Sequence, residues 1–233
     1  MAKYGALISL SNGNPFITPD STPMTLYRKV TVNSTFGGDF NSASASVTID
    51  GQKGGIAFAR TSAPAKISAS KSGNTFSVDA SNYKGSAFVL EAYFFAIYPL
   101  TLPAWGVAIW DAEGTLVLTN ESRVLSDLTT IGSPGAATGG LNIDTYMTGK
   151  WAVNPMGLGS VLLHAGSAPG GQPIIQPVDV GTGCFNEGAG TRIKGLSSTT
   201  ASGSSVGTTN RGIVITAINT AAYHKTDRIK RTI

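Results

Sequence analysis

Short runs of alternating hydrophobic and polar residues recur about every ten residues in the first half of the chain. Such alternation turns one face of a strand toward a core and the other toward solvent. Gly, Asn, Asp and Pro separate most of these runs, which span residues 24–32, 45–50, 55–60, 65–70 and 75–79. Short strands at this spacing are typical of a β-sandwich or a β-barrel.

The longest apolar run, residues 86–98, carries aromatic side chains at both alternating positions. This pattern favours a central strand that is buried on both faces, with a short core helix as the alternative. Further strands are predicted at 147–153, 158–164 and 212–219, and loops at 132–140, 168–173 and 195–210. The last of these loops is rich in Ser, Thr and Gly, a composition that predicts a long flexible segment in isolation.

Residues 105–122 predict the β-hairpin around which the chain is organised. Two β-prone runs flank Asp-Ala-Glu-Gly, so Gly114 is expected at a positive φ. A gapless alignment at an offset of 101 residues pairs this stretch with residues 4–21, and it matches Trp105 to Tyr4 and Gly114 to Gly13. The match predicts an internal repeat of a strand-turn-strand unit, and two ordinary hairpins that merely look alike are the alternative.

Pro99 and Pro103 stand just before the repeat begins again. Because paired prolines favour a linker, the sequence predicts a boundary between them. The expected architecture is all-β, with two β-sandwich-like modules at 1–100 and 104–233 and long Gly/Ser/Thr-rich loops. The second module is expected to end in a basic C-terminal arm.

Charged residues make up 13% of the chain, about half the ~25% usual for soluble domains. Helical surfaces need more charge, so the composition favours β-structure. A Ser/Thr/Gly/Ala surface also suits a subunit that neighbours cover in an assembly. Residues 224–233 hold +3 of the net charge of +4. No stacking aromatics accompany these charges, so a basic terminal arm is preferred to a nucleic-acid site.

The single cysteine, Cys184, cannot form an intrachain disulfide. The first residues lack the apolar core of a signal peptide, and Glu91 and Pro99 interrupt the most apolar window, 87–102, which is also too short to cross a bilayer. We therefore expect the protein to accumulate in the cytoplasm of the cell that makes it, with no membrane insertion.

No motif predicts catalysis. Residues 203–207 read Gly-x-Ser-x-Gly around Ser205, but they lie in a polar loop and not at the strand-to-helix turn that a nucleophile elbow needs. The residues around Gly149-Lys150 lack the other positions of a phosphate-binding loop. His164, Cys184 and His224 share no metal-ligand spacing. The acidic residues lie mostly in turns, and no pair is marked as a glycosidase site. We expect no catalytic, cofactor-binding or metal-binding residues and no cofactor.

Exposed aromatic residues could stack on sugar rings, as in many glycan-binding modules. The candidates are Trp105, Trp110, Trp151, Tyr83 and Tyr146. The simpler interpretation is that Trp105 and Trp151 fill sandwich cores.

Two stretches resemble the opening of small tailed-bacteriophage proteins encoded near tail-tip and host-specificity genes. These proteins begin with a Tyr-Gly-apolar strand, a turn with Asn-x-Gly or Asp-x-x-Gly, and a second strand. Residues 4–13 and 105–119 are similar to this opening, and Asn120-Glu-Ser-Arg123 is similar to the Ser/Asn-x-x-Arg that follows it. The resemblance covers about a fifth of the chain, and two copies depart from the usual single one.

The resemblance implies a noncatalytic virion protein of the tail tip or tail fibre that works through contacts with other tail proteins and with copies of itself. The alternative is a glycan- or receptor-binding module for host attachment. A cytoplasmic enzyme, whose site only folding would assemble, is the third and weakest hypothesis.

Overall fold

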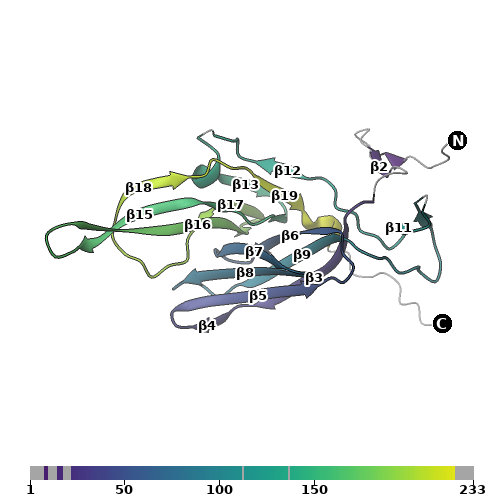
Figure 1. The fold of residues 1–233 in the computed structure, drawn as a ribbon, viewed down its shortest axis with the longest axis horizontal. Helices are drawn as coiled ribbons and strands as arrows, with labels where there is room; N and C mark the ends of the chain where they lie inside the picture. The colour runs from purple at the N-terminus through teal and green to yellow at the C-terminus, as the bar shows by residue number, and fades with distance from the viewer. Residues whose placement is uncertain (1–7, 10–14, 18–21, 112, 136, 224–233) are drawn as a thin grey trace.

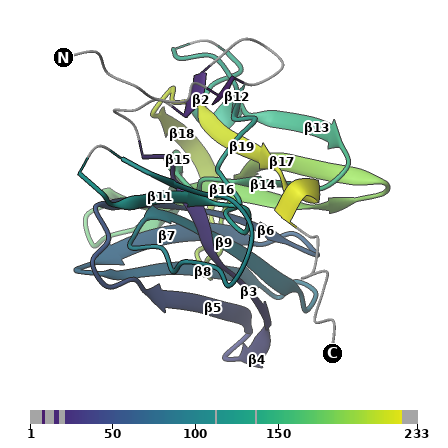
Figure 2. The same ribbon diagram turned by 90° about the vertical axis from the view of Figure 1, so that its right-hand side faces the viewer.

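The computed structural model describes residues 8–9, 15–17, 22–111, 113–135 and 137–223. These residues form β-strands and two short 3-10 helices, with no α-helix among them. The prediction of an all-β chain is confirmed. Fifteen of the strands join one sheet, and two hairpins form separate two-stranded sheets. Figures 1 and 2 show the arrangement from two directions.

The described strands of the first half, with the hairpin that opens the second, are β1 Ile8–Ser9, β2 Pro15–Ile17, β3 Thr25–Asn33, β4 Thr35–Gly37, β5 Phe40–Thr48, β6 Gly54–Thr61, β7 Lys66–Ser72, β8 Thr75–Tyr83, β9 Val89–Ile97, β10 Ala108–Trp110 and β11 Leu116–Thr119. The elements that follow are β12 Thr129–Ile131, η1 Gly140–Asn142, β13 Asp144–Thr148, β14 Trp151–Val153, β15 Gly157–Ser167, β16 Pro173–Glu187, β17 Gly190–Leu196, β18 Ser204–Asn210, β19 Ile215–Asn219 and η2 Thr220–Tyr223.

Two layers of antiparallel strands make up the first half. One layer has the order β3-β9-β6 and the other β4-β5-β8-β7. The alternation in β5 and β8 turns their small and apolar side chains toward β6 and β9. Together these strands supply much of one buried cluster, which includes Ala45, Val47, Val78, Leu90 and Phe94.

Strand β9 is the central strand that the sequence predicts at residues 86–98. It pairs with β3 on one side and with β6 on the other. Leu90 and Phe94 face the first core cluster, whereas Tyr93 and Phe95 face a second cluster with Tyr223. Both faces are therefore buried, and the core-helix alternative for this segment is wrong.

The second half contains the orders β12-β19-β14 and β13-β17-β16. These repeat the orders β3-β9-β6 and β5-β8-β7 of the first half. Corresponding strands also follow one another in the same sequence along the chain. In the first half a two-residue turn with Gly73 at φ +56° joins β7 to β8. In the second half a two-residue turn with Gly188 at φ +56° joins β16 to β17. Strands β15 and β18 have no counterpart among the described strands of the first half.

Strands from both halves hydrogen-bond to one another. Ala59 of β6 pairs with Val153 of β14, and Ile67 of β7 pairs with Thr182 of β16. One large sheet results, instead of two separate sandwiches. Residues 99–103 connect β9 to the hairpin of β10 and β11 without a strand of their own. The division into domains at 1–100 and 104–233 stays a prediction.

The prediction of a flexible loop at residues 195–210 is wrong for much of that stretch. β17 continues to Leu196, and Ser204–Asn210 form β18, which pairs with β15. Neighbouring backbone supplies the hydrogen bonds here, so a strand forms without an apolar pattern in its own sequence. The basic C-terminal arm, residues 224–233, lies outside the described residues.

Candidate interaction surface

The predicted hairpin at 105–122 is confirmed. Ala108 pairs with Thr119, Ile109 with Leu118 and Trp110 with Leu116, with a β-bulge between residues 109 and 110. Figure 1 shows β11 at one end of the molecule, away from the large sheet. The hairpin is thus a projecting element whose strands belong to neither layer.

The Asp111 side chain organises the hairpin turn. Its Oδ1 accepts the backbone N–H groups of Glu113, at 3.1 Å, and Thr115, at 2.7 Å. Gly114 has φ +81°, the positive value that the sequence predicts. Asp is suited to this position because its short carboxylate can accept hydrogen bonds from the residues that follow it.

A second turn fixes the base of the hairpin. The Ser122 hydroxyl accepts the Thr119 N–H at 3.0 Å, and the Thr119 hydroxyl accepts the Glu121 N–H at 3.2 Å. Gly106 has φ +121°, and a Cβ placed there would lie 2.1 Å from Oδ1 of Asn120. Glycine is therefore required where the chain enters the hairpin.

The side chains at the start of the hairpin face solvent. The exposed fractions are 58% for Leu102, 71% for Trp105, 64% for Val107 and 51% for Trp110. Single exposed apolar residues are ordinary, but a run of them on one projecting element marks an interaction surface. We call these four residues the hairpin patch.

The five aromatic candidates do not come together on one element. Trp105 and Trp110 belong to the hairpin, so the interpretation of Trp105 as a core residue is wrong. Trp151 packs against the main core cluster and donates its Nε1–H to the Thr148 carbonyl at 2.9 Å, as the core interpretation predicts. Tyr83 contacts Phe40 at a ring distance of 5.3 Å. Tyr146 lies on β13 and is 46% exposed.

The stretch that the sequence matches to this hairpin, residues 4–21, is described only at residues 8–9 and 15–17. Ile8 pairs with Ile17 and Ser9 with Pro15, with an irregularity between residues 8 and 9. Adding 101 to each number gives the pairs 109 with 118 and 110 with 116, which are pairs of the second hairpin. The two hairpins therefore share register and bulge position, whereas Tyr4 and Gly13 lie outside the described residues.

The segments that follow the two hairpins pair with each other. The Leu125 N–H donates to the Met24 carbonyl at 2.8 Å, and the Leu26 N–H donates to the Arg123 carbonyl at 2.8 Å. Met24 and Leu125 are equivalent at the same offset of 101 residues. The two bonds flank the antiparallel bridge between Thr25 and Val124.

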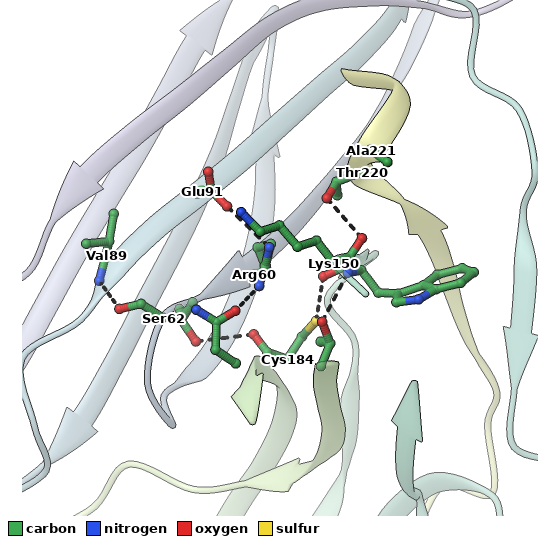
Figure 3. A network of polar contacts seen from close by, with 12 residues as sticks. Arg60, Ser62, Val89, Glu91, Lys150, Cys184, Thr220 and Ala221 are labelled. Atoms are coloured by element: carbon green, nitrogen blue, oxygen red, sulfur yellow. Dashed lines mark hydrogen bonds and ion pairs between the residues drawn. The ribbon is translucent and has the colours of Figure 1, made fainter. Parts of the chain in front are cut away.

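A polar cluster centred on the buried Arg60 joins the two halves (Figure 3). Arg60 is 2% exposed, and its Nη2 donates to Oδ1 of Asn186 on β16. Its Nη1 lies 3.6 Å from Glu91, which also accepts from Lys29 at 2.5 Å. The backbone carbonyl of Cys184 accepts from the Thr61 hydroxyl at 3.2 Å.

Burial explains the electrostatics of this cluster. It raises the pKa of the Cys184 thiol to about 12, and the thiol donates to the Trp151 carbonyl at 3.3 Å. Burial and the nearby Glu91 carboxylate raise the pKa of Tyr93 well above its usual range. Both groups stay protonated at neutral pH, so neither of these two side chains is an activated nucleophile.

The remaining sequence candidates lie apart. His164 is on β15, Cys184 is buried in β16, and His224 falls outside the described residues. Within the described ranges, no three His, Cys, Asp or Glu side chains are grouped to hold a metal ion. Ser205 lies within strand β18 and not in the loop that the sequence predicts. None of the helices in the described part is long and apolar enough to cross a membrane.

Sequence reasoning missed the partners of Arg60. Arg60 and Glu91 each stand in an apolar run, and a charge in such a run signals a buried pair. The chain separation of 126 residues between Arg60 and Asn186 hides the contact itself.

No family model, no curated protein and no solved structure matches this chain.

Proposed function

We propose that the chain is a noncatalytic structural component of a bacteriophage tail, in the tail-tip or tail-fibre region, that acts through contacts with other virion tail proteins and with copies of itself. The observation that carries the proposal is the hairpin patch, which consists of three exposed apolar side chains of the projecting hairpin and Leu102 just before it. The same hairpin carries the sequence resemblance to phage tail proteins. The protein would be made in the host cytoplasm and end in the virion.

The chemistry of the hairpin patch supports a protein partner. Trp residues are enriched among the side chains that dominate protein-protein binding energy. Trp105 and Trp110 together expose large aromatic faces on an element whose backbone two turns hold in place. A preformed element loses little conformational entropy when it docks, so such a hairpin suits subunit contact.

We also infer that the two halves are copies of one β-sandwich-like module, fused edge to edge. The repeated strand orders, the matching glycine turns and the common hairpin register support this organisation. A duplicated module gives one chain two related docking elements. This role needs no catalytic residue, no cofactor and no metal.

Mass spectrometry of purified particles tests the tail role. In the phage that encodes this chain, the protein should be present in virions at a fixed ratio to the other tail proteins. A variant with Trp105→Ala and Trp110→Ala should fold but be depleted from particles. Phe36→Ala is the matched control, because Phe36 is 70% exposed on β4 and lies outside the hairpin. Absence of the wild-type chain from particles would refute the role.

Host-surface binding is the second candidate, and the two exposed tryptophans of the hairpin favour it. Aromatic faces stack on sugar rings, so a glycan array of the purified chain should show selective binding. The double variant at Trp105 and Trp110 should lose that binding, whereas Phe36→Ala and Tyr146→Ala should keep it. Binding that survives in the double variant would remove the hairpin as a glycan site.

A further inference from the structure

Strands β15, β16 and β18 extend from the body as an arm, which we define as residues 157–180 and 204–210. Figure 1 shows the arm at the end of the molecule opposite β11. β15 is its middle strand, with β16 on one side and β18 on the other. Ile174, Ile175 and Val206 are 47%, 43% and 56% exposed. The described strands of the first half include no equivalent of β15 or β18, so the arm is an addition to the repeated strand order.

One edge of the arm is closed to further strands. The Arg211 N–H donates to the Leu158 carbonyl at 3.0 Å, and hydrogen-bonded pairs recur at every second residue of this register, so Leu162, opposite Gly207, directs its own N–H and carbonyl toward β18. Its partner in β16, Pro177, therefore stands at an outward-facing position of that strand. Proline has no N–H to offer there, and Pro173 lies further along the same strand. Proline at an outward position is a common protection of an edge strand.

The other edge of the arm, β18, is open. The Arg211 N–H donates to the Leu158 carbonyl at 3.0 Å, which fixes the alternation of the adjoining strand. Thr209 and Gly207 thus face β15, whereas Thr208 directs its N–H and carbonyl away from β15. β18 pairs with β15 and with no other described strand. It contains neither proline nor charge, so nothing in its sequence blocks a further strand.

The charge distribution favours a copy of the same chain as the occupant. Among residues 157–180 and 204–210, Asp179 is the only Asp, Glu, Lys or Arg, and it lies on β16 and not on the open edge. Two such arms do not repel each other, and they carry no charge pattern that would select a different partner. Strand edges of the two halves already pair with each other, antiparallel at Ala59 with Val153 and at Ile67 with Thr182, and parallel at Thr61 with Phe185. Self-pairing of one edge is closed by a twofold axis and stops at two chains.

We propose that β18 is a dimerisation edge, where the β18 strands of two copies pair antiparallel and join two arms into one continuous sheet. Backbone hydrogen bonds supply the affinity, as in other β-strand additions. This interface deepens the self-association that the proposed function includes, and it rests on that part of it.

Size-exclusion chromatography with light scattering on the full chain tests the interface. The wild type should have the mass of two chains. Thr208→Pro removes the outward N–H while keeping the β15 ladder, and should halve the mass. Thr208→Val, which keeps the N–H, should remain a dimer. Circular dichroism and tryptophan fluorescence check that each variant is folded.

An added charge on the edge provides a second, independent variant in case Thr208→Pro disturbs the arm. Val206→Lys places like charges on two facing edges and should also give the mass of one chain. Ile175→Lys is the matched control on the proline-protected edge, and it should remain a dimer. If Val206→Lys and a folded Thr208→Pro both keep the wild-type mass, the interface is wrong.

The outcome for this edge is separable from the outcome for the tail role. A monomeric wild type that is nevertheless found in virions overturns the β18 interface and leaves the tail role standing. A β18-dependent dimer that is absent from virions supports the interface and refutes the tail role.

Discussion

Replacing Arg60 with methionine should destabilise both halves of the molecule together. Arg60 belongs to β6 in the first half, and its guanidinium contacts Glu91 on β9 and Asn186 on β16 in the second half. Methionine fills a similar volume but offers no N–H. The variant therefore leaves the side-chain Oδ1 of Asn186 without the donor that crosses between the halves.

The expected loss in the free energy of unfolding is about 3 kcal/mol. Breaking a buried charged pair costs about 3–5 kcal/mol when one partner remains. Glu91 is still 22% exposed and keeps Lys29 at 2.5 Å, which places the value at the low end. Among the described residues, Nε of Arg60 has no hydrogen-bond partner, which also lowers what the arginine contributes. About 3 kcal/mol still changes the folding equilibrium more than a hundredfold.

Urea unfolding followed by tryptophan fluorescence and by circular dichroism measures the effect. All three tryptophans, Trp105, Trp110 and Trp151, follow residue 104, so fluorescence reports on the second half. If the halves unfold as one unit, a change in β6 should shift the fluorescence and the dichroism midpoints equally.

A double-mutant cycle with Asn186→Ala isolates the contact between the halves. The coupling free energy should be about 1–2 kcal/mol, within the range for directly bonded side chains. Lys84→Met is the control, because Lys84 is exposed and lies 3.9 Å from Asp39, a pair that contributes little. A coupling below about 0.3 kcal/mol, or a fluorescence midpoint that Arg60→Met leaves unmoved, would refute the reasoning.

Three further changes test separate features. Because the buried Cys184 thiol has a pKa of about 12, the unfolded thiol loses its proton first as pH rises. Stability should therefore fall between about pH 9 and pH 12, by at most ~1.4 kcal/mol per pH unit, and Cys184→Ala should show a shallower fall; equal slopes would contradict this. Gly55→Ala places a Cβ 2.7 Å from Phe76 and should cost about 1–3 kcal/mol in thermal unfolding, whereas Gly37→Ala, with open space around it, should cost far less. Asp111→Ala removes the acceptor of two turn N–H groups and should speed amide hydrogen exchange in the hairpin turn, with little effect on the large sheet.

The elements that the sequence predicts well carry their own local signal. The aromatic residues at both alternating positions of 86–98 predict burial on both faces, and β9 is buried on both. Asp111 and Gly114 predict the hairpin turn because each has a backbone reason to be there.

The elements that the sequence does not predict depend on distant partners. Ser204–Asn210 has no apolar alternation, and β15 supplies the ladder that makes it a strand. The joining of the halves through Arg60 and Asn186 spans 126 residues of chain. The hairpin patch is intermediate, because the sequence locates its tryptophans but does not predict the exposure of Trp105.

The position of Tyr223 in the chain has a consequence for synthesis on the ribosome. Its ring lies 5.0 Å from Phe95, and its hydroxyl donates to the Val124 carbonyl at 3.1 Å. Phe58 and Phe95 are fully buried in the same cluster. The nascent first half must therefore leave this aromatic surface uncovered until the last described residues emerge. A chain that stops before Tyr223 would therefore keep this aromatic surface exposed, and exposed apolar surface on an incomplete fold favours aggregation.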